Sequence, residues 1–268
     1  MGAVIDTITF QATAPGVAAF AASIPASGDS FTVRNTALTD PIFMLQHWAW
    51  NQTAGSMRVR SPKLHDNVQG IRREVPAGAV DITESFAVPQ RLWPQDTLIF
   101  EQMGSGTAGQ IETGSALLYY GNFPGISATL IDLPTLQKNV VNLFSPIVTP
   151  TPGVGGGYTG AVAINATEDL YIANTWYALL GYMTSARCAT VSVRGPDTGN
   201  LRCSGPGEPL KQDVTARWFV LLTAWYGLPL IPCFNSANKQ STFLDVVTNQ
   251  TGGALNVNLM LAQLSGVM

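Results

Sequence analysis

Histidine is the scarcest of the chemically active residues in this sequence, with only His47 and His65 present. Enzymes of the cupin type build a metal centre inside a β-sandwich, and they generally need several histidines, two of them closely spaced, and a carboxylate. Two separated histidines cannot supply that set. We expect His47 to be a packed strand residue between aromatic neighbours, and His65 to contact Asp66 or a neighbouring subunit.

Paired carboxylates are a second possible source of chemistry. Glu101 and Glu112 could face each other across a hairpin, as the two carboxylates of a glycosidase do. Such pairs are more often solvated hairpin charges, and the G-x-S-x-G turn of serine hydrolases does not occur in the sequence. We therefore expect no catalytic residue, no metal ligand and no cofactor.

A glycine pattern typical of nucleotide binding occurs in the middle of the chain. Gly155, Gly157 and Gly160 satisfy G-x-G-x-x-G, but that motif needs a preceding strand and a helix that starts at once, so that the helix N-terminus meets the phosphates. Here a proline-rich segment precedes the glycines and AVAINATEDL follows them. We therefore interpret the pattern as part of a loop.

The composition narrows the remaining classes of function. Only 12% of the residues are charged and 46% are apolar, with a net charge of −3, whereas about 25% charged residues is usual in soluble proteins. Scattered basic residues do not predict direct nucleic-acid binding. The low charge favours burial of surface against other chains. Cys188, Cys203 and Cys233 are expected to be reduced, buried thiols.

The most informative pattern is an internal repeat. The segment VRSPKLHD begins at Val59 and VRGPDTGN begins at Val193, which is 134 positions later in a chain of 268 residues. The flanking segments repeat in the same order: FMLQHWAW with YALLGYMT, GIRREVPAG with NLRCSGPGE, DITESF with DVTARW, and LWPQDTLIF with GLPLIPCF. Long-period repetition predicts two similar domains. The repeated Arg60 and Arg194 are expected to hold a loop by binding carbonyl groups or a carboxylate.

Short strands explain most of the sequence, because β-branched and aromatic residues recur between clusters of Gly, Pro, Asn, Asp and Ser. In DSFTVR the alternation places Phe31 and Val33 on one face. The expected strands are AVIDTITFQA, DSFTVRN, PIFMLQHWAW, SMRVRS, AVDITESFAV, DTLIFEQM and QIETGSALLYY, then DLYIANTWYALLGYM, CATVSVRG, DVTARWFVLLTAWY, LPLIPCF, STFLDVV and ALNVNLMLAQL.

Two segments need separate interpretation. DLPTLQKNVVNLF is the best helix candidate, with Asp132 as its N-cap, and it leads into the Pro- and Gly-rich SPIVTPTPGVGGGYTG. The uncharged run from Trp218 to Phe234 is interrupted by Gly and Pro and is shorter than the roughly 20 residues of a membrane span. We expect two buried strands joined by a turn there.

The predicted fold is all-β, with two tandem eight-stranded jelly-roll sandwiches, a double jelly roll, joined by a short helix and loop. The first jelly roll is expected at 1–132 and the second at 133–268, with the linker helix and Gly/Pro loop at about 133–160.

On these paired segments, the chain resembles the double jelly-roll major capsid proteins of tailless, membrane-containing bacteriophages and adenovirus. The resemblance covers the whole chain as architecture and involves no specific family motif. It implies three chains in a trimer of six sandwiches with a pseudo-hexagonal outline, tiling an icosahedral shell. Partners would be the chain itself, neighbouring capsomers, other capsid or penton proteins and, in many members, an internal viral membrane.

The resulting hypothesis is a structural capsid protein of a small icosahedral virus, assembled in the host cytoplasm, with no enzymatic activity. Two alternatives remain. One is a receptor- or carbohydrate-binding β-sandwich of a virion spike or fibre, in which Trp48, Trp50 and Trp176 would stack on sugars. The other is a cupin-like enzyme, which a stoichiometric transition metal in the purified protein would support.

Overall fold

The structure is a computed structural model of the chain. It describes residues 2–26, 30–34, 41–64, 67–78, 80–81, 88–104, 108–152, 157–158, 161–248 and 255–265. Antiparallel strands dominate it, arranged in four sheets, two from each half of the chain.

The first half forms a sandwich of a large and a small sheet. The large sheet has the order β3-β1-β10-β4-β7, with β8 also paired to β4, and the small sheet has the order β2-β9-β5-β6. The strands are β1 (Gly2–Thr13), β2 (Ala21–Ala22), β3 (Ile24–Pro25), β4 (Ile42–Trp50), β5 (Gly55–Arg60), β6 (Ile71–Val75), β7 (Val80–Asp81), β8 (Gln90–Arg91), β9 (Ile99–Met103) and β10 (Ile111–Phe123).

The second half forms a sandwich of the same kind. Its large sheet has the order β11-β18-β15-β20-β12, with β13 also paired to β20, and its small sheet has the order β14-β19-β16-β17. The strands are β11 (Leu130–Ile131), β12 (Val140–Phe144), β13 (Ile147–Val148), β14 (Val162–Ala163), β15 (Trp176–Thr184), β16 (Cys188–Arg194), β17 (Cys203–Gly207), β18 (Ile231–Asn235), β19 (Phe243–Val247) and β20 (Val257–Leu264).

The two halves repeat one topology. In the first, β1-β10-β4-β8 form one sheet and β2-β9-β5-β6 the other; in the second, β12 or β13 with β20-β15-β18 and β14-β19-β16-β17 take the same places. If the eight main strands of a half are numbered along the chain, both sandwiches have sheets of order 1-8-3-6 and 2-7-4-5. The repeat of the sequence is therefore matched by a repeat of strand order.

Part of the proposed alignment of the halves is wrong. FMLQHWAW and YALLGYMT are the equivalent strands β4 and β15, but LWPQDTLIF and GLPLIPCF are not equivalent throughout. The end of the first segment belongs to β9, whose topological equivalent is β19, whereas PCF belongs to β18. The second half inserts helices before β18, and proline residues in both segments made the two look alike.

Three other expectations about elements are also wrong. DSFTVRN forms only an isolated bridge, Thr32 to Thr97, within its described residues, although Val33 is fully buried as predicted. The supposed linker contains β12 and β13, which pair with β20, so it is part of the second sandwich. The second large sheet also begins before residue 133, because β11 pairs with β18.

The helices differ from the expected ones. Asp132 caps α1 (Leu133–Asn139) by accepting from the Thr135 amide at 2.9 Å, as predicted, but the helix ends where Val140 and Val141 start β12. The first part of the apolar run expected as two strands forms α3 (Trp218–Tyr226), preceded by α2 (Gln212–Thr215) and ended by Gly227 in the left-handed conformation, whereas the end of the run belongs to the buried strand β18, as predicted. An apolar run without period cannot distinguish a buried strand from a buried helix.

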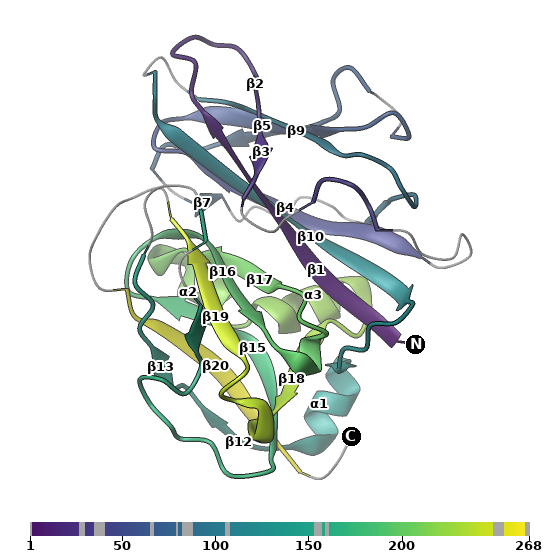
Figure 1. Cartoon of the computed structure of the whole chain (residues 1–268), viewed down its shortest axis with the longest axis vertical. Coiled ribbons are helices and arrows are strands. Elements are labelled where there is room, and N and C mark those ends of the chain that lie inside the picture. Colours follow the sequence, from purple (N-terminus) through teal and green to yellow (C-terminus); the bar gives the residue numbers. More distant parts are fainter. Residues whose placement is uncertain are drawn as a thin grey trace.

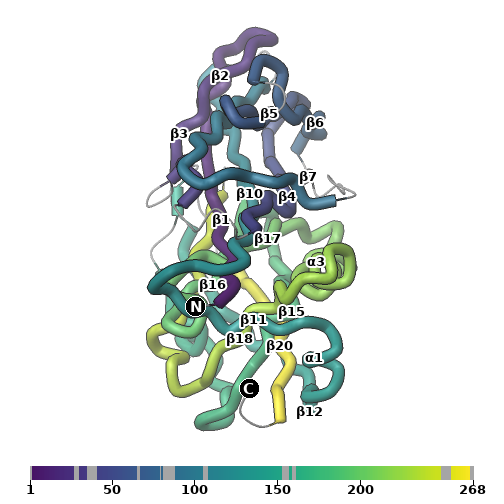
Figure 2. Tube along the Cα trace, turned by 90° about the vertical axis from the view of Figure 1, so that its right-hand side faces the viewer, coloured from purple at the N-terminus to yellow at the C-terminus, as the bar shows by residue number. Residues whose placement is uncertain are grey.

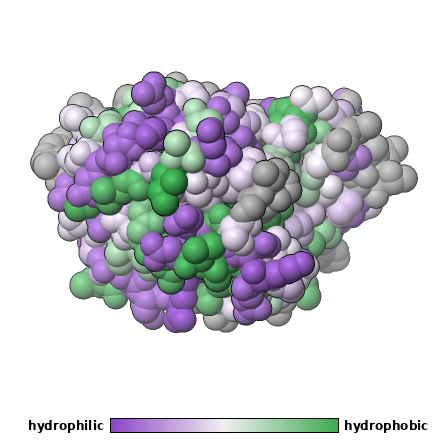
Figure 3. Space-filling view, turned by 90° about the horizontal axis from the view of Figure 1, so that it is seen from below, coloured by the Kyte–Doolittle hydropathy of each residue, from purple (hydrophilic) through white to green (hydrophobic). Residues whose placement is uncertain are grey.

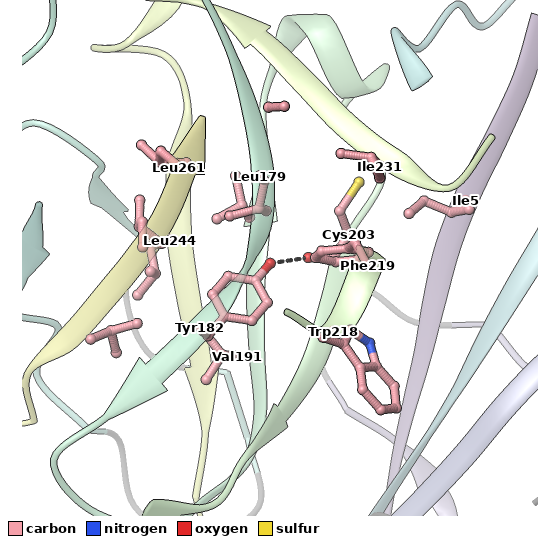
Figure 4. Close-up of a cluster of buried hydrophobic side chains, with 14 of the residues drawn as sticks. Ile5, Leu179, Tyr182, Val191, Cys203, Trp218, Phe219, Ile231, Leu244 and Leu261 are labelled. Carbon is pink, nitrogen blue, oxygen red and sulfur yellow. Dashed lines mark hydrogen bonds between the residues drawn. The ribbon is translucent and has the colours of Figure 1, made fainter. Parts of the chain in front are cut away.

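Strand alternation produces two separate contact faces on the large sheet of the first half. On β10, Ala116 and Leu118 enter the core of the first sandwich, while Leu117 and Tyr119 belong to a second core cluster that is centred on the other half. That cluster is drawn in Figure 4, where the Tyr182 hydroxyl donates to the Cys203 carbonyl oxygen at 2.6 Å.

The sheets are stacked in four layers along the longest axis of the molecule (Figures 1 and 2). The order is the first small sheet, the first large sheet, the second small sheet with α3 beside it, and the second large sheet. The first large sheet is therefore covered on both faces, while the outer faces of the two end sheets are not covered by the other half.

Candidate functional site at the junction of the two halves

The junction is the contact between β1, β4 and β10 of the first half and β16, β17 and α3 of the second. Trp48 is one of two tryptophans that the first half contributes to the second core cluster, the other being Trp50. The Trp48 ring meets Trp218 edge-on, with centroids 5.7 Å apart, and its Nε1 donates to the Ala189 carbonyl at 2.7 Å. Both tryptophans are buried. Because Trp48 lies on the opposite face of β4 from the core residue Ala49, alternation directs it to the junction.

A chain of hydroxyl groups crosses the same contact. The Tyr158 hydroxyl lies 2.6 Å from Thr9 Oγ1, Thr9 Oγ1 lies 3.0 Å from Ser115 Oγ, and Ser115 Oγ lies 2.5 Å from Thr190 Oγ1. Hydroxyls can donate and accept, so the chain can satisfy its members without charge. Short side chains also allow the two sheets to approach closely.

Glu208 is a charged link at the edge of the junction. Its Oε2 accepts from the Val80 amide at 2.9 Å and from Arg187 Nε at 2.7 Å, and the residue is 2% exposed. Burial alone would raise the pKa of Glu208, but the hydrogen bonds from Arg187 and from backbone amides outweigh it and lower the pKa. The carboxylate therefore joins the two halves in its ionised form.

A small polar pocket lies on the other side of the junction, around Asp6. The Asp6 carboxylate accepts from Arg34 Nη2 at 3.2 Å and from the Arg202 amide at 3.3 Å. Burial raises the pKa of Asp6, and Arg34 partly offsets this effect. The cavity measures about 110 Å³, which is room for about three or four water molecules.

The repeated arginines have the structural role that the sequence predicted. Arg60 binds Glu101 through two nitrogens, at 2.9 and 3.1 Å, and donates to the Asn67 carbonyl at 3.2 Å. In the second half, Arg194 Nε binds Asp245 at 2.7 Å. The acids lie at equivalent places on β9 and β19, so an ion pair was duplicated together with the strand order.

Glu101 and Glu112 do not form the opposed pair considered from the sequence. Glu101 lies on the outer face of β9, where hydrogen bonds from Arg60 lower its pKa against the effect of burial. Glu112 points into the first sandwich, where burial raises its pKa to about 7. The two carboxylates occupy opposite faces of different sheets, and that geometry cannot flank a glycosidic bond.

The histidines and tryptophans considered from the sequence differ in how far they are buried. His47 is buried in β4, as predicted, while His65 lies outside the described residues. Trp48 and Trp50 are each 1% exposed, so the expectation that they could stack on a sugar is wrong. Trp176 is only partly buried, at the start of β15.

The three cysteines are free and buried, and burial raises the pKa of each thiol. Within the described residues, no group of three or more His, Cys, Asp or Glu is placed to hold a metal ion. No helix among those residues is long and apolar enough to cross a membrane. Of the three motif glycines, only Gly157 lies in the described part.

The sequence did not reveal the residues that join the halves. Glu208, Trp218 and Tyr226 all reach the first half, the last through its hydroxyl, which donates to the Leu45 carbonyl at 2.5 Å. The repeat itself predicted two domains, but it did not show which faces of the two domains meet. No residue pattern identified the partners.

Comparison with known proteins gives little further information. No family model matches the chain, and no curated protein matches its sequence. One solved structure that is similar is described as the crystal structure of PBSX exported protein XepA. It is 12% identical, with 97% of this chain and 86% of that chain covered and a TM-score of 0.25.

Proposed function

We propose that this chain is a major capsid protein that self-assembles, as a trimeric capsomer, into an icosahedral virus shell, and that it has no catalytic activity. The observation that carries the proposal is the head-to-tail junction. Two sandwiches of one topology meet through different faces, the large sheet of the first and the small sheet of the second.

The strand order supports the jelly-roll assignment within this proposal. A jelly roll has eight antiparallel strands in two sheets and is built from two Greek keys, so that the first and last strands are neighbours. The orders 1-8-3-6 and 2-7-4-5 in both halves fit that topology. The two copies would form a double jelly roll.

The junction also suggests how copies of the chain would associate. A contact between two different faces is heterologous, and repetition of such a contact closes a ring when the rotation permits. Each chain leaves one face of each type uncovered by its other half: the outer face of the first small sheet and the outer face of the second large sheet. Three chains joined through these faces would place six sandwiches in a ring.

Exposed apolar residues occur at the edge of the second large sheet, as such an interface requires. Val141 and Leu143 of β12 are 61% and 62% exposed, and alternation places both on one face of the strand. Figure 3 views the molecule from below, from the end where β12 lies, and shows apolar patches between the polar ones. A neighbouring chain would remove this surface from water.

The test is the mass of the purified chain in solution by light scattering, followed by negative-stain images of the same peak. A trimer with a hexagonal outline is expected. Val141→Asp with Leu143→Asp should give a folded monomer, while Leu210→Asp, at another highly exposed apolar position, should leave the trimer intact. A parent chain that stays monomeric at every concentration would refute the proposal.

The proposed location is the virion, with other capsid or penton proteins, and in some viruses an internal membrane, as further partners. No observation favours the carbohydrate-binding alternative, because burial of Trp48 and Trp50 removes two of its three candidate residues. A cupin-like enzyme would need His47 to be part of a group of metal ligands, and the surroundings of His47 in β4 give no specific support for such a group.

A further inference from the structure

One end of the first sandwich encloses three polar side chains that have no hydrogen-bond partner. They are Glu112 of β10, Asn51 immediately after β4, and Gln102 of β9, and all are 1% exposed or less. Both carboxylate oxygens of Glu112 and both amide atoms of Asn51 and Gln102 lack partners. Leaving such a buried group without a partner destabilises the folded state, and a charged group does so most.

Strand register places the three side chains on inward faces near one end of the interior. Thr113 pairs with Trp50, so one step further along the two antiparallel strands Asn51 lies beside Glu112. On the facing sheet, the pairing of Ser56 with Met103 places Gly55 opposite Gly104. Gln102 lies two residues before Gly104 on the same face of β9, about 7 Å along the strand.

The two glycines make the room that the polar groups occupy. A Cβ on Gly104 would lie 1.2 Å from Glu112 Oε1, and one on Gly55 would lie 3.0 Å from Asn51 Nδ2. Neither glycine has the left-handed backbone conformation. Glycine is therefore needed at these two positions because it has no side chain, and not because of its backbone freedom. The carboxylate therefore rests against the backbone of β9.

Glu112 also differs from the other buried acids of the described residues. Glu101, Glu208 and Asp245 each bind an arginine, and Asp96 accepts from the Ser61 hydroxyl at 2.5 Å. All 14 lysines and arginines of the chain lie in the described part, and none donates to Glu112. The protein itself supplies no positive charge for this carboxylate.

We propose that this cluster is a binding site for one hard divalent cation, Ca²⁺ or Mg²⁺, held by the Glu112 carboxylate and by the side-chain oxygens of Asn51 and Gln102. Carboxylate and carboxamide oxygens are the ligands that these ions prefer, and water can complete the shell. The ion would supply the missing charge and would bind several orphaned oxygens at once.

A surface pocket lies beside the cluster. Gly55 and Met103, which border the cluster, also line this pocket of about 570 Å³, whereas Asn51, Gln102 and Glu112 do not line it. Entry of an ion from this pocket would therefore need a local opening at this end of the sandwich. The inference is independent of the proposed capsid function, because it concerns only the interior of one sandwich.

The experiment uses the purified full chain, stripped with EDTA and titrated calorimetrically with CaCl₂ and, separately, with MgCl₂. We expect one ion per chain and a rise in melting temperature that EDTA reverses. Glu112→Gln should abolish both effects. Glu74→Gln, which removes an exposed carboxylate paired with Arg72, is the matched control and should retain both effects.

Two results would overturn the proposal. One is a parent chain that binds neither ion at millimolar concentration and melts identically with and without EDTA, in which case the carboxyl is held as a neutral acid. The other is ion binding that Glu112→Gln leaves unchanged. If that variant does not fold, Asn51→Asp serves instead: it adds a carboxylate to the cluster and should tighten Ca²⁺ binding, and unchanged affinity would count against the site.

Discussion

Strands β5 and β16 occupy the same place in the two sandwiches but have outer faces of different chemistry. On β5 the outer face carries Arg58 and Arg60, both bound to Glu101, and the Arg58 guanidinium lies 4.1 Å from the centre of the Phe20 ring. On β16, the fully buried Ser192 takes the place of Arg58, while Arg194 keeps the place of Arg60 and binds Asp245. In the small sheet that packs against the other half of the chain, a short uncharged side chain has thus replaced one of the two arginines, whereas the equivalent uncovered sheet has kept both.

A second difference lies on the neighbouring strands β4 and β15. In the alignment of FMLQHWAW with YALLGYMT, His47 stands against Gly181. The strand registers place them on different faces: His47 pairs with the core residue Ala116, and Gly181 pairs with the partly exposed Met260. A Cβ on Gly181 would lie 2.2 Å from the Thr215 carbonyl oxygen, so glycine permits the close approach of α2. Positions that align in sequence therefore differ in what packs against them.

The largest effect should come from breaking the junction between the halves. Trp48→Ala removes a fully buried ring and its hydrogen bond to Ala189, and we expect a loss of about 3–5 kcal/mol in the free energy of unfolding. Trp93→Ala, at a tryptophan that is 44% exposed, is the control and should cost far less. Urea denaturation measures both, and equal losses would contradict the role of Trp48.

The duplicated ion pairs should differ in strength. Arg194→Ala leaves Asp245, which is 2% exposed, with Arg202 Nε at 4.0 Å as its remaining cation, so a loss of about 3 kcal/mol is expected. Arg60→Ala should cost less, because Arg58 still binds Glu101 at 2.6 Å.

Restoring neutrality distinguishes charge from packing in this pair. Arg194→Ala combined with Asp245→Asn should recover part of the lost stability in the same urea assay. A double variant as unstable as the sum of its single variants would show that the two side chains do not act as a pair.

The backbone approach at Gly181 gives the third prediction. Gly181→Ala should destabilise the second half by about 1–3 kcal/mol, because the new methyl group overlaps the backbone of α2. Gly157→Ala is the control, since nothing lies within 4 Å of its Cβ position. Thermal melting compares the two, and equal melting temperatures would show that α2 moves away without cost.

The buried imidazole makes the first half sensitive to acid. Burial, with a smaller effect of Arg73, lowers the pKa of His47 to about 3, whereas the unfolded chain titrates at about 6.5. Between these values the unfolded state binds the extra proton, so stability falls as the pH drops below about 6.5. We expect His47 to account for about 1–2 kcal/mol of the loss between pH 7 and pH 5.

His47→Gln should reduce that dependence on pH, and His65→Gln should not. Urea denaturation of both variants at pH 7 and pH 5 provides the comparison. If the parent and His47→Gln lose equal stability, carboxylates rather than this imidazole control the acid response.

The strands and their repetition could be predicted, but their partners could not. Alternating and β-branched segments such as DTITF and VSVR identified β1 and β16, and the repeated VRSP and VRGP segments revealed the duplication. Short strands such as β6 and β17 were missed, because Arg, Glu, Gly and Pro in them weaken the strand pattern. Helix α3 was missed because its apolar run has no period.

The candidate sites were less predictable for a physical reason. Sequence pattern identifies the face on which a residue lies, but Trp48 was misplaced because both faces of β4 are buried. From the sequence, Glu112 was considered only as half of a carboxylate pair. Its surroundings in the structure come from Gly104 and Gln102 on another strand, so the local sequence could not show that its carboxylate has no hydrogen-bond partner. Contacts across a sandwich are non-local, and no local motif encodes them.

The covered outer face of the first large sheet has a consequence for synthesis of the protein. All strands of the first half precede residue 124, but β16 and β17, which cover Ile5, Trp48 and Leu117, begin at residues 188 and 203. While the ribosome makes the intervening segment, the first sandwich can fold with an apolar face open to water, and such surfaces promote aggregation. The apolar face is therefore covered only after the second half of the chain has been synthesised and has folded.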